Sequence, residues 1–197
     1  LFQPERGKLF IDGIDVRDIP LETLRKAIGM VPQESFLFSD SIAENISFGT
    51  ESLDLESSVS AATISQIHEE VVEFPNGYEQ TVGERGVTLS GGQKQRIALS
   101  RAIIRDPVII ILDDAFSSVD TSTEEAILEG LRDTLAERTS LIVSHRVTTL
   151  RDTDLVIYLE EGRITETGSH QELIDRGGRY AGMVERQALI EELESLQ

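Results

Sequence analysis

An α/β fold with a mostly parallel sheet is the architecture that the sequence predicts, and two observations carry this prediction. Segments with helical periodicity alternate with short apolar segments of strand length, which is typical of parallel sheets covered by helices. Residues 108–112 form an uninterrupted apolar run directly after a helical segment, as expected for a strand buried on both faces. Residues 155–159 and 163–167 flank a Glu-Glu-Gly turn and predict a small antiparallel β element in addition.

The first half of the chain is predicted to contain two strands and a long helix. Residues 8–14 alternate as a strand and include an Asp-Gly turn signal, and a second strand is expected to end at Val31. Apolar side chains recur every three or four positions over residues 53–74, which predicts one helix that Pro75 ends.

The second half is predicted to alternate helices with strands. Helices are expected over residues 92–104 and 121–137, and residues 141–143 are the next apolar strand. Ser169 and Glu172 have the spacing of a capping box and predict a closing helix. The acidic residues at the very end are expected to fray.

The composition excludes several classes of protein. The net charge is −18, from 36 acidic and 18 basic residues, so the chain repels nucleic acid backbones and no nucleic acid partner is expected. The sequence has no cysteine, which excludes disulfides and thiolate metal sites. No run approaches the roughly 20 apolar residues that cross a bilayer, so any membrane association has to come through a partner or through sequence outside these residues.

The most specific motif is Leu-Ser-Gly-Gly-Gln at residues 89–93, at the start of a predicted helix. A serine and two glycines at a helix start expose backbone N–H groups to an anion, and the helix dipole adds positive potential there. Gln93 can donate to a phosphate or ribose oxygen. Taken alone, the motif is equally consistent with a glycine-rich helix start that binds nothing.

Two carboxylates, Asp113 and Asp114, end the buried strand. P-loop NTPases use such a pair to hold Mg²⁺ and to poise a water molecule: one carboxylate faces the metal and its neighbour orients or deprotonates the water. Gln33 follows another predicted strand and places an amide where it could touch Mg²⁺ or water. His145 follows the strand at residues 141–143, where it would reach a γ-phosphate or serve as an ordinary structural histidine.

Five elements in this order resemble the nucleotide-binding domain of ATP-binding cassette (ABC) transporters, and the resemblance covers essentially the whole chain. Gln33 matches the Q-loop, residues 90–93 the signature motif, and Asp113 the Walker B aspartate. Asp120 matches the D-loop and His145 the switch histidine.

The resemblance implies a P-loop NTPase (RecA-like) fold with an inserted helical subdomain. Residues 1–33 and 105–197 would form the core, and residues 34–104 the helical subdomain that carries the signature motif. It further implies that two cassettes pair head to tail around ATP and Mg²⁺.

Each cassette of such a pair serves two nucleotides. Ser90, Gly91, Gly92 and Gln93 would contact ATP held mainly by the partner, and Asp120 would lie at the dimer contact. This chain's own nucleotide would meet Gln33 and Asp113 as metal ligands, and Asp114, His145 and Gln33 as catalytic groups.

Three further segments are similar to exporter cassettes in particular: residues 36–46, 81–86 and 168–173. In exporters the first faces the coupling helices and the second, the x-loop, contacts the membrane part. The implied function is an ATP-hydrolysing motor that couples cassette dimerisation to export. It would be tethered to the cytoplasmic face of the membrane by a transmembrane domain of the same polypeptide. A soluble, non-transport ABC ATPase is the alternative, although the heptads that a chromosome-maintenance ATPase needs are not present.

The sequence departs from the family in lacking a phosphate-binding loop. No G-x-x-x-x-G-K-[ST] motif occurs in it. In the family this Walker A P-loop lies just upstream of a segment like residues 1–15, so the expectation is a chain truncated upstream, which is inactive alone because the loop and its lysine cradle the phosphates.

A second departure is Asp114, which stands where active cassettes usually have glutamate. Aspartate is one methylene shorter, so its oxygens lie about 1.5 Å farther from the water. A misplacement of that size can cost about 10²-fold in rate. Asp114 therefore favours a degenerate, mainly regulatory half of a heterodimer, and the alternative is a homodimer in which aspartate still works.

Overall fold

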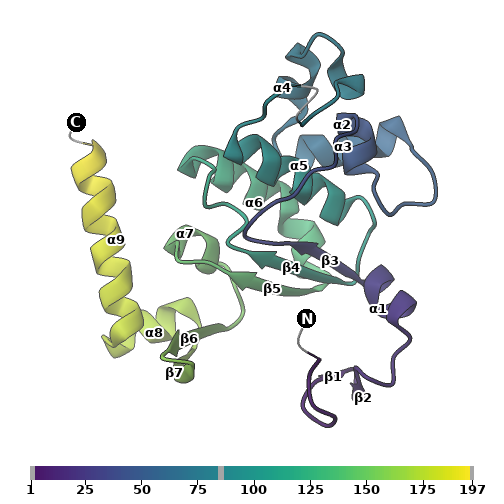
Figure 1. Ribbon diagram of the computed structural model, residues 1–197. Coiled ribbons are helices and arrows are strands. Elements are labelled where there is room, and N and C mark those ends of the chain that lie inside the picture. Colours follow the sequence, from purple (N-terminus) through teal and green to yellow (C-terminus); the bar gives the residue numbers. More distant parts are fainter. Residues whose placement is uncertain (1–2, 84–86, 196–197) are drawn as a thin grey trace. The chain divides into compact units, whose positions relative to one another are not determined.

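The computed structural model describes residues 3–83 and 87–195, which divide into two compact units, Leu1–Leu141 and Ile142–Gln197 (Figure 1). Each unit is considered by itself. The predicted α/β class is confirmed, since the elements include a parallel strand pair, helices and small antiparallel pairs.

The main sheet has three strands in the order β3 (Ile28–Val31), β4 (Ile109–Asp113) and β5 (Thr139–Val143). β3 and β4 run parallel, with Val31 opposite Leu112. The carboxyl ends of these two strands therefore meet at one edge of the sheet, where parallel α/β sheets bind their ligands. β4 is the apolar run predicted to be a buried strand, and Ile110 and Leu112 are 1% and 0% exposed.

Helix α5 (Gly91–Ile103) is the centre of the first unit. It packs against β3 and against two short helices, α2 (Ile42–Ile46) and α3 (Leu55–Ile64), as Figure 1 shows. The helix is buried on more than one side, and Ile97 and Leu99 are almost fully buried. The helix ends where the sequence predicts, because Asp106 takes a left-handed conformation and Pro107 cannot continue a helix.

The remaining helical elements of the first unit are short, except for α6 (Thr121–Ala136), which lies within the predicted helix 121–137. They are α1 (Leu21–Ala27), α4 (His68–Glu73), and the 3₁₀ turn η1 (Gly77–Glu79).

The single helix predicted over residues 53–74 is wrong: α3 and α4 are separate helices. Ser65 ends α3, and the Ile67 N–H donates to the Ala62 carbonyl across the end of the helix. Gln66, between them, has a φ of 55°. Such a helix end normally uses glycine, so the sequence carries no visible signal for the break.

The strand predicted over residues 8–14 is also wrong, although its turn signal is correct. Asp12 and Gly13 both have positive φ and separate β1 (Phe10–Ile11) from β2 (Ile14–Asp15), which pair antiparallel. Two successive residues with positive φ are what a two-residue hairpin turn requires.

The second unit contains the predicted hairpin, β6 (Val156–Glu160) and β7 (Arg163–Gly168), followed by α8 (His170–Arg176). The Ser169–Glu172 capping box that predicted α8 is present.

A short helix, α7 (Val147–Leu150), precedes this hairpin, and a long one, α9 (Arg179–Ser195), follows α8. The core of the unit is formed by Val156, Leu173 and Tyr180. The acidic end expected to fray belongs to α9 instead. In the part of the chain that the structure describes, no helix is long and apolar enough to cross a membrane.

Candidate nucleotide site

The carboxyl edge of β3 and β4 brings Gln33 and Asp114 together. Gln33 Nε2 lies 3.4 Å from Asp114 Oδ2, a long and therefore weak hydrogen bond. Asp113 is the last residue of β4 and is half-buried beside them. We call Gln33, Asp113 and Asp114 the strand-edge cluster.

Asp114 has a left-handed backbone, with a φ of 48°. Aspartate tolerates this region better than most residues, but the conformation still costs on the order of 1 kcal/mol. The surrounding structure must hold it in place.

The strand-edge cluster suits Mg²⁺ by its chemistry. Mg²⁺ takes oxygen ligands and is usually bound by one or two carboxylates together with phosphates of a nucleotide. Two adjacent carboxylates and an amide oxygen supply such donors.

The signature motif lies at the N-terminus of α5, and a capping box fixes its conformation. The Ser90 hydroxyl accepts a hydrogen bond from the Gln93 N–H at 3.1 Å, and the Ser90 N–H donates to Gln93 Oε1 at 2.8 Å. The first N–H groups of a helix have no partner within the helix, so this end can receive an anion.

The Gln93 side chain is also held from outside the helix. Its Nε2 donates to Glu70 Oε2 at 2.7 Å, and the other oxygen of Glu70 pairs with Arg96 at 2.6 Å. Because an amide group carries two hydrogens, one donor can still serve a nucleotide.

The two glycines of the motif pack against the loop at residues 114–120. A Cβ added to Gly92 would lie 2.7 Å from the Ser118 carbonyl oxygen, too close for any side chain. At Gly91 an added Cβ would meet the Ser118 side chain at 3.1 Å, which a small shift can relieve. Gly92 is therefore required by packing, and Gly91 much less so.

Asp120 is the N-cap of α6. Its Oδ1 accepts hydrogen bonds from the Ser122 hydroxyl at 2.7 Å and the Thr123 N–H at 2.9 Å. These bonds, that of Ser122 first, hold the pKa of Asp120 well below its usual range. Asp120 thus has a structural role as a helix cap, in addition to the role at a dimer contact that the sequence predicts.

His145 belongs to the second unit. It lies on the short segment between β5 and α7 and is exposed. The Ser144 hydroxyl accepts from the Arg146 N–H at 3.0 Å and shapes this segment.

The described side chains of Gln33, Asp113, Asp114, Asp120 and residues 90–93 all lie in the first unit, around the carboxyl edge of its sheet and the start of α5. The model of the ABC transporter family matches residues 1–117. This chain belongs to that family.

Relatives with 43–46% identity include several named ABC proteins. The mitochondrial iron-sulfur clusters transporter atm1 of Neurospora crassa is 43% identical over 96% of this chain and 27% of its own length. The heavy metal tolerance protein of Schizosaccharomyces pombe is 46% identical over 95% and 23%. The ABC transporter ATP-binding protein YfiB of Bacillus subtilis, described as uncharacterised, is 45% identical over 95% and 32%. The chain thus spans about a quarter to a third of the length of these relatives.

A solved structure agrees with the sequence comparison. A bacterial Atm1-family ABC exporter with ATP bound superposes with a TM-score of 0.86 and 41% identity, over 91% of this chain and 32% of that one. At this similarity the ABC fold is shared, and the ABC exporters are the group that these relatives represent.

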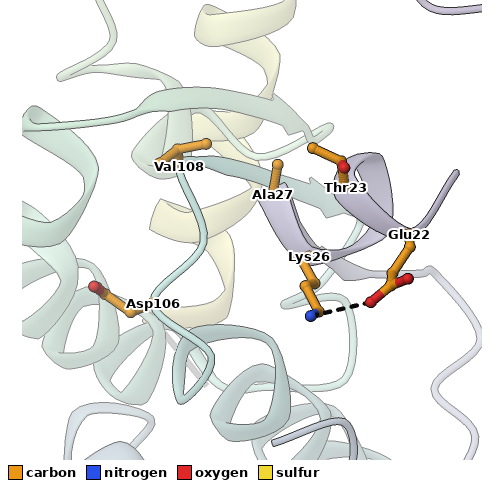
Figure 2. Close-up of a pocket in the computed structure, with 6 residues that line it drawn as sticks. All are labelled: Glu22, Thr23, Lys26, Ala27, Asp106 and Val108. Carbon is orange, nitrogen blue, oxygen red and sulfur yellow. Dashed lines mark ion pairs between the residues drawn. The ribbon is translucent and has the colours of Figure 1, made fainter. Parts of the chain in front are cut away.

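One hollow on the ABC domain lies away from the strand-edge cluster. A cavity of about 520 Å³ is open beside α1 and the start of β4 (Figure 2). It contains the Glu22–Lys26 ion pair, which is exposed and therefore weak. Val108, on its wall, lies before the first residue of β4, about 16 Å along the strand from Asp113. The hollow is thus at the opposite end of the strand from the predicted chemistry.

The x-loop and the residues that hold the signature motif differ in how far the sequence predicted them. Of the x-loop predicted at residues 81–86, residues 84–86 lie outside the described part of the chain. Glu70, Arg96 and Gln95 hold the motif or its neighbouring loop and were not predicted. Gln95 had one signal: a polar residue on the apolar face of a predicted helix.

Proposed function

We propose that this chain is the ATP-binding and ATP-hydrolysing motor domain of an ABC exporter. The observation that carries the proposal is the meeting of Gln33 and Asp114 at the carboxyl edge of the parallel sheet. Residues 1–33 and 105–197 would be the core of the cassette and residues 34–104 its helical subdomain.

The chemistry assigned to the strand-edge cluster is phosphoryl transfer to water. Asp113 and Gln33 would hold Mg²⁺, which when bound neutralises charge on the phosphates. Asp114 would orient and deprotonate the attacking water, and Gln33 would hold that carboxylate in place. His145 would add a donor to the γ-phosphate.

The signature motif is proposed to serve ATP held by a second cassette. Its capped helix start, with Gly92 packed on Ser118, presents N–H groups to an anion without needing any group from the strand-edge cluster. The proposed partner is therefore another ABC cassette, and no nucleic acid is involved.

A transmembrane domain is the second proposed partner, and it would dock beside Arg101. The Arg101 guanidinium donates to the carbonyls of Phe36 and Asn45 at 2.9 and 2.7 Å and so fixes residues 36–46 on α5. Phe36 and Phe48 are 66% and 54% exposed, which is unusual for phenylalanine without a partner.

A hollow of about 440 Å³ lies beside these residues, and its walls include Leu24, Met30, Phe38, Phe48 and Arg101. It could receive a helix of the membrane part. The proposed location is the cytoplasmic face of the cell membrane, with the cassette tethered through a transmembrane domain.

A degenerate, mainly regulatory cassette is the second candidate, and Asp114 favours it. The aspartate is one methylene shorter than glutamate, and its hydrogen bond with Gln33 is long at 3.4 Å. In this case the hydrolytic site would lie in a different subunit of a heterodimer.

The ATPase rate of the complete exporter polypeptide, purified without any second cassette protein, separates the two candidates. A rate on the order of 1 s⁻¹ or more means that Asp114 is a competent base and that a homodimer suffices. A background rate that a second cassette restores supports the regulatory half. No hydrolysis with any partner contradicts the proposed function.

The 197 residues alone are proposed to be inactive, because they contain no P-loop to cradle the phosphates. Calorimetry of this chain with Mg-ATP should therefore show no tight binding. Micromolar binding would overturn this proposal.

A further inference from the structure

Gln95 is a buried polar side chain on α5, two residues beyond the signature motif. It is 4% exposed and lies on the same helix face as the buried Ala98, Leu99 and Ala102. An amide in such a position is costly unless it is hydrogen-bonded. The hydrogen-bond partners of the Gln95 amide therefore determine its conformation.

The Gln95 amide forms hydrogen bonds with the loop at residues 114–118. Gln95 Oε1 accepts from the Ser118 N–H at 2.9 Å, and Nε2 donates to the Ser117 hydroxyl at 2.8 Å. The Asp114 carbonyl oxygen lies 3.5 Å from the same Nε2. Gln95 thus binds the backbone and side chains of the loop at three points.

The loop that Gln95 binds carries one of the groups proposed for hydrolysis. Asp114 begins it in a strained left-handed conformation that needs support. A second link, Gly92 against the Ser118 carbonyl, joins the same loop to the signature motif.

We infer that Gln95 is a positioning residue that couples the signature end of α5 to the Asp114 loop, so that a nucleotide bound at the motif aligns the carboxylate serving the other nucleotide. Gln95 touches no substrate and acts through Asp114. The expected effect of Gln95 on kcat rests on the proposed function. Its expected effect on the conformation of the loop does not.

The test is Gln95→Met in the complete exporter, because methionine keeps the length and loses the hydrogen bonds. We expect kcat to fall about tenfold or more while KM for ATP changes less than about threefold, since a misplaced carboxylate affects the chemical step rather than binding. Hydrogen exchange at the Ser118 amide should speed up by about tenfold or more. Ser117→Ala, at an exposed position, should reduce kcat by about threefold.

Gln171→Met is the matched control, since Gln171 is an exposed glutamine of α8 and should leave kcat and Ser118 exchange unchanged. The inference is overturned if Gln95→Met leaves kcat unchanged, or if kcat per folded molecule is normal once the folded fraction is measured. If the wild-type exporter lacks ATPase activity, the proposed function fails, and unchanged Ser118 exchange in Gln95→Met then overturns the structural link as well.

Discussion

The signature end of α5 and the strand-edge cluster are held in very different ways. Ser90 and Gln93 cap each other, Glu70 holds Gln93 from a second helix, and Gly92 packs on Ser118. In the strand-edge cluster, a hydrogen bond of 3.4 Å, which is long, joins Gln33 to Asp114. The motif is anchored to a second helix and to the Ser118 backbone, whereas the position of Asp114 in the cluster depends on the loop that Gln95 binds.

This difference fits a division of labour between recognition and chemistry. A preorganised anion site loses little entropy when a nucleotide binds. A catalytic carboxylate at the start of such a loop can be aligned by the same binding event. Substitutions in the signature motif should therefore alter the ATPase rate by disturbing backbone packing. Substitutions in the strand-edge cluster should alter it by changing how far a side chain reaches.

The largest effect is expected from alanine substitutions in the motif. Gly92→Ala should reduce the ATPase rate of the complete exporter by about 10²-fold or more, because its Cβ would force the Ser118 backbone to move. Gly91→Ala should cost less than about tenfold, because only a side chain must shift. Equal losses of ATPase rate in the two variants would contradict the conclusion that Gly92 is required by packing and Gly91 much less so.

Asp114→Glu tests the reach of the carboxylate. The added methylene extends it by about 1.5 Å. We expect the ATPase rate of the exporter, assayed without another cassette, to rise by about tenfold or more. A rate that stays the same or falls would show that aspartate is already the competent base.

Glu70→Ala measures how firmly the motif is held. Arg96 is only 12% exposed and would lose its carboxylate partner, while Gln93 would lose its outer contact. Because Glu70 itself is partly solvated, we expect a loss of only about 1–2 kcal/mol in the free energy of unfolding, measured by urea denaturation of this chain. Glu69→Ala, at an exposed position of the same helix, should change it by less than about 0.5 kcal/mol.

The smallest effect concerns the Asp120 cap and its pH dependence. Hydrogen bonds from Ser122 and Thr123 lower the pKa of Asp120 in the folded chain, so its stabilising effect is present at neutral pH. The effect should begin to be lost as the pH falls below about 4, the pKa of an unfolded aspartate, and should decline further toward the lowered pKa of the folded chain. Asp120→Ala should therefore lower the thermal midpoint slightly at pH 7 and much less at pH 3. Asp120→Asn, an equally good cap, should show no such dependence. A pH-independent loss in Asp120→Ala would contradict the cap.

The sequence predicts best those features that follow from local periodicity. The buried strand β4, helix α5 and the β6–β7 hairpin were predictable because apolar runs and turn residues specify them. The sequence places Gln33 and Asp114 each after a predicted strand, but only the structure shows that these two strands are neighbours. The break at Gln66 was not predictable, because a non-glycine residue adopts the left-handed conformation there.

Contacts between distant segments were also beyond sequence reasoning. Glu70 reads as a solvated acid on a short helix, and only tertiary packing places it beside Gln93 and Arg96. Gln95 shows as a polar residue on an apolar face, but its partners lie more than 18 residues away along the chain.

The most direct test of the account is the Mg²⁺-dependent ATPase rate of the complete exporter carrying Asp113→Asn, measured with whatever cassette partner the wild type requires. If Asp113 holds the metal for phosphoryl transfer, the rate should fall by about 10²-fold or more while the protein remains folded. An Asp113→Asn exporter that hydrolyses ATP at the wild-type rate would contradict the assignment of the strand-edge cluster as the catalytic site.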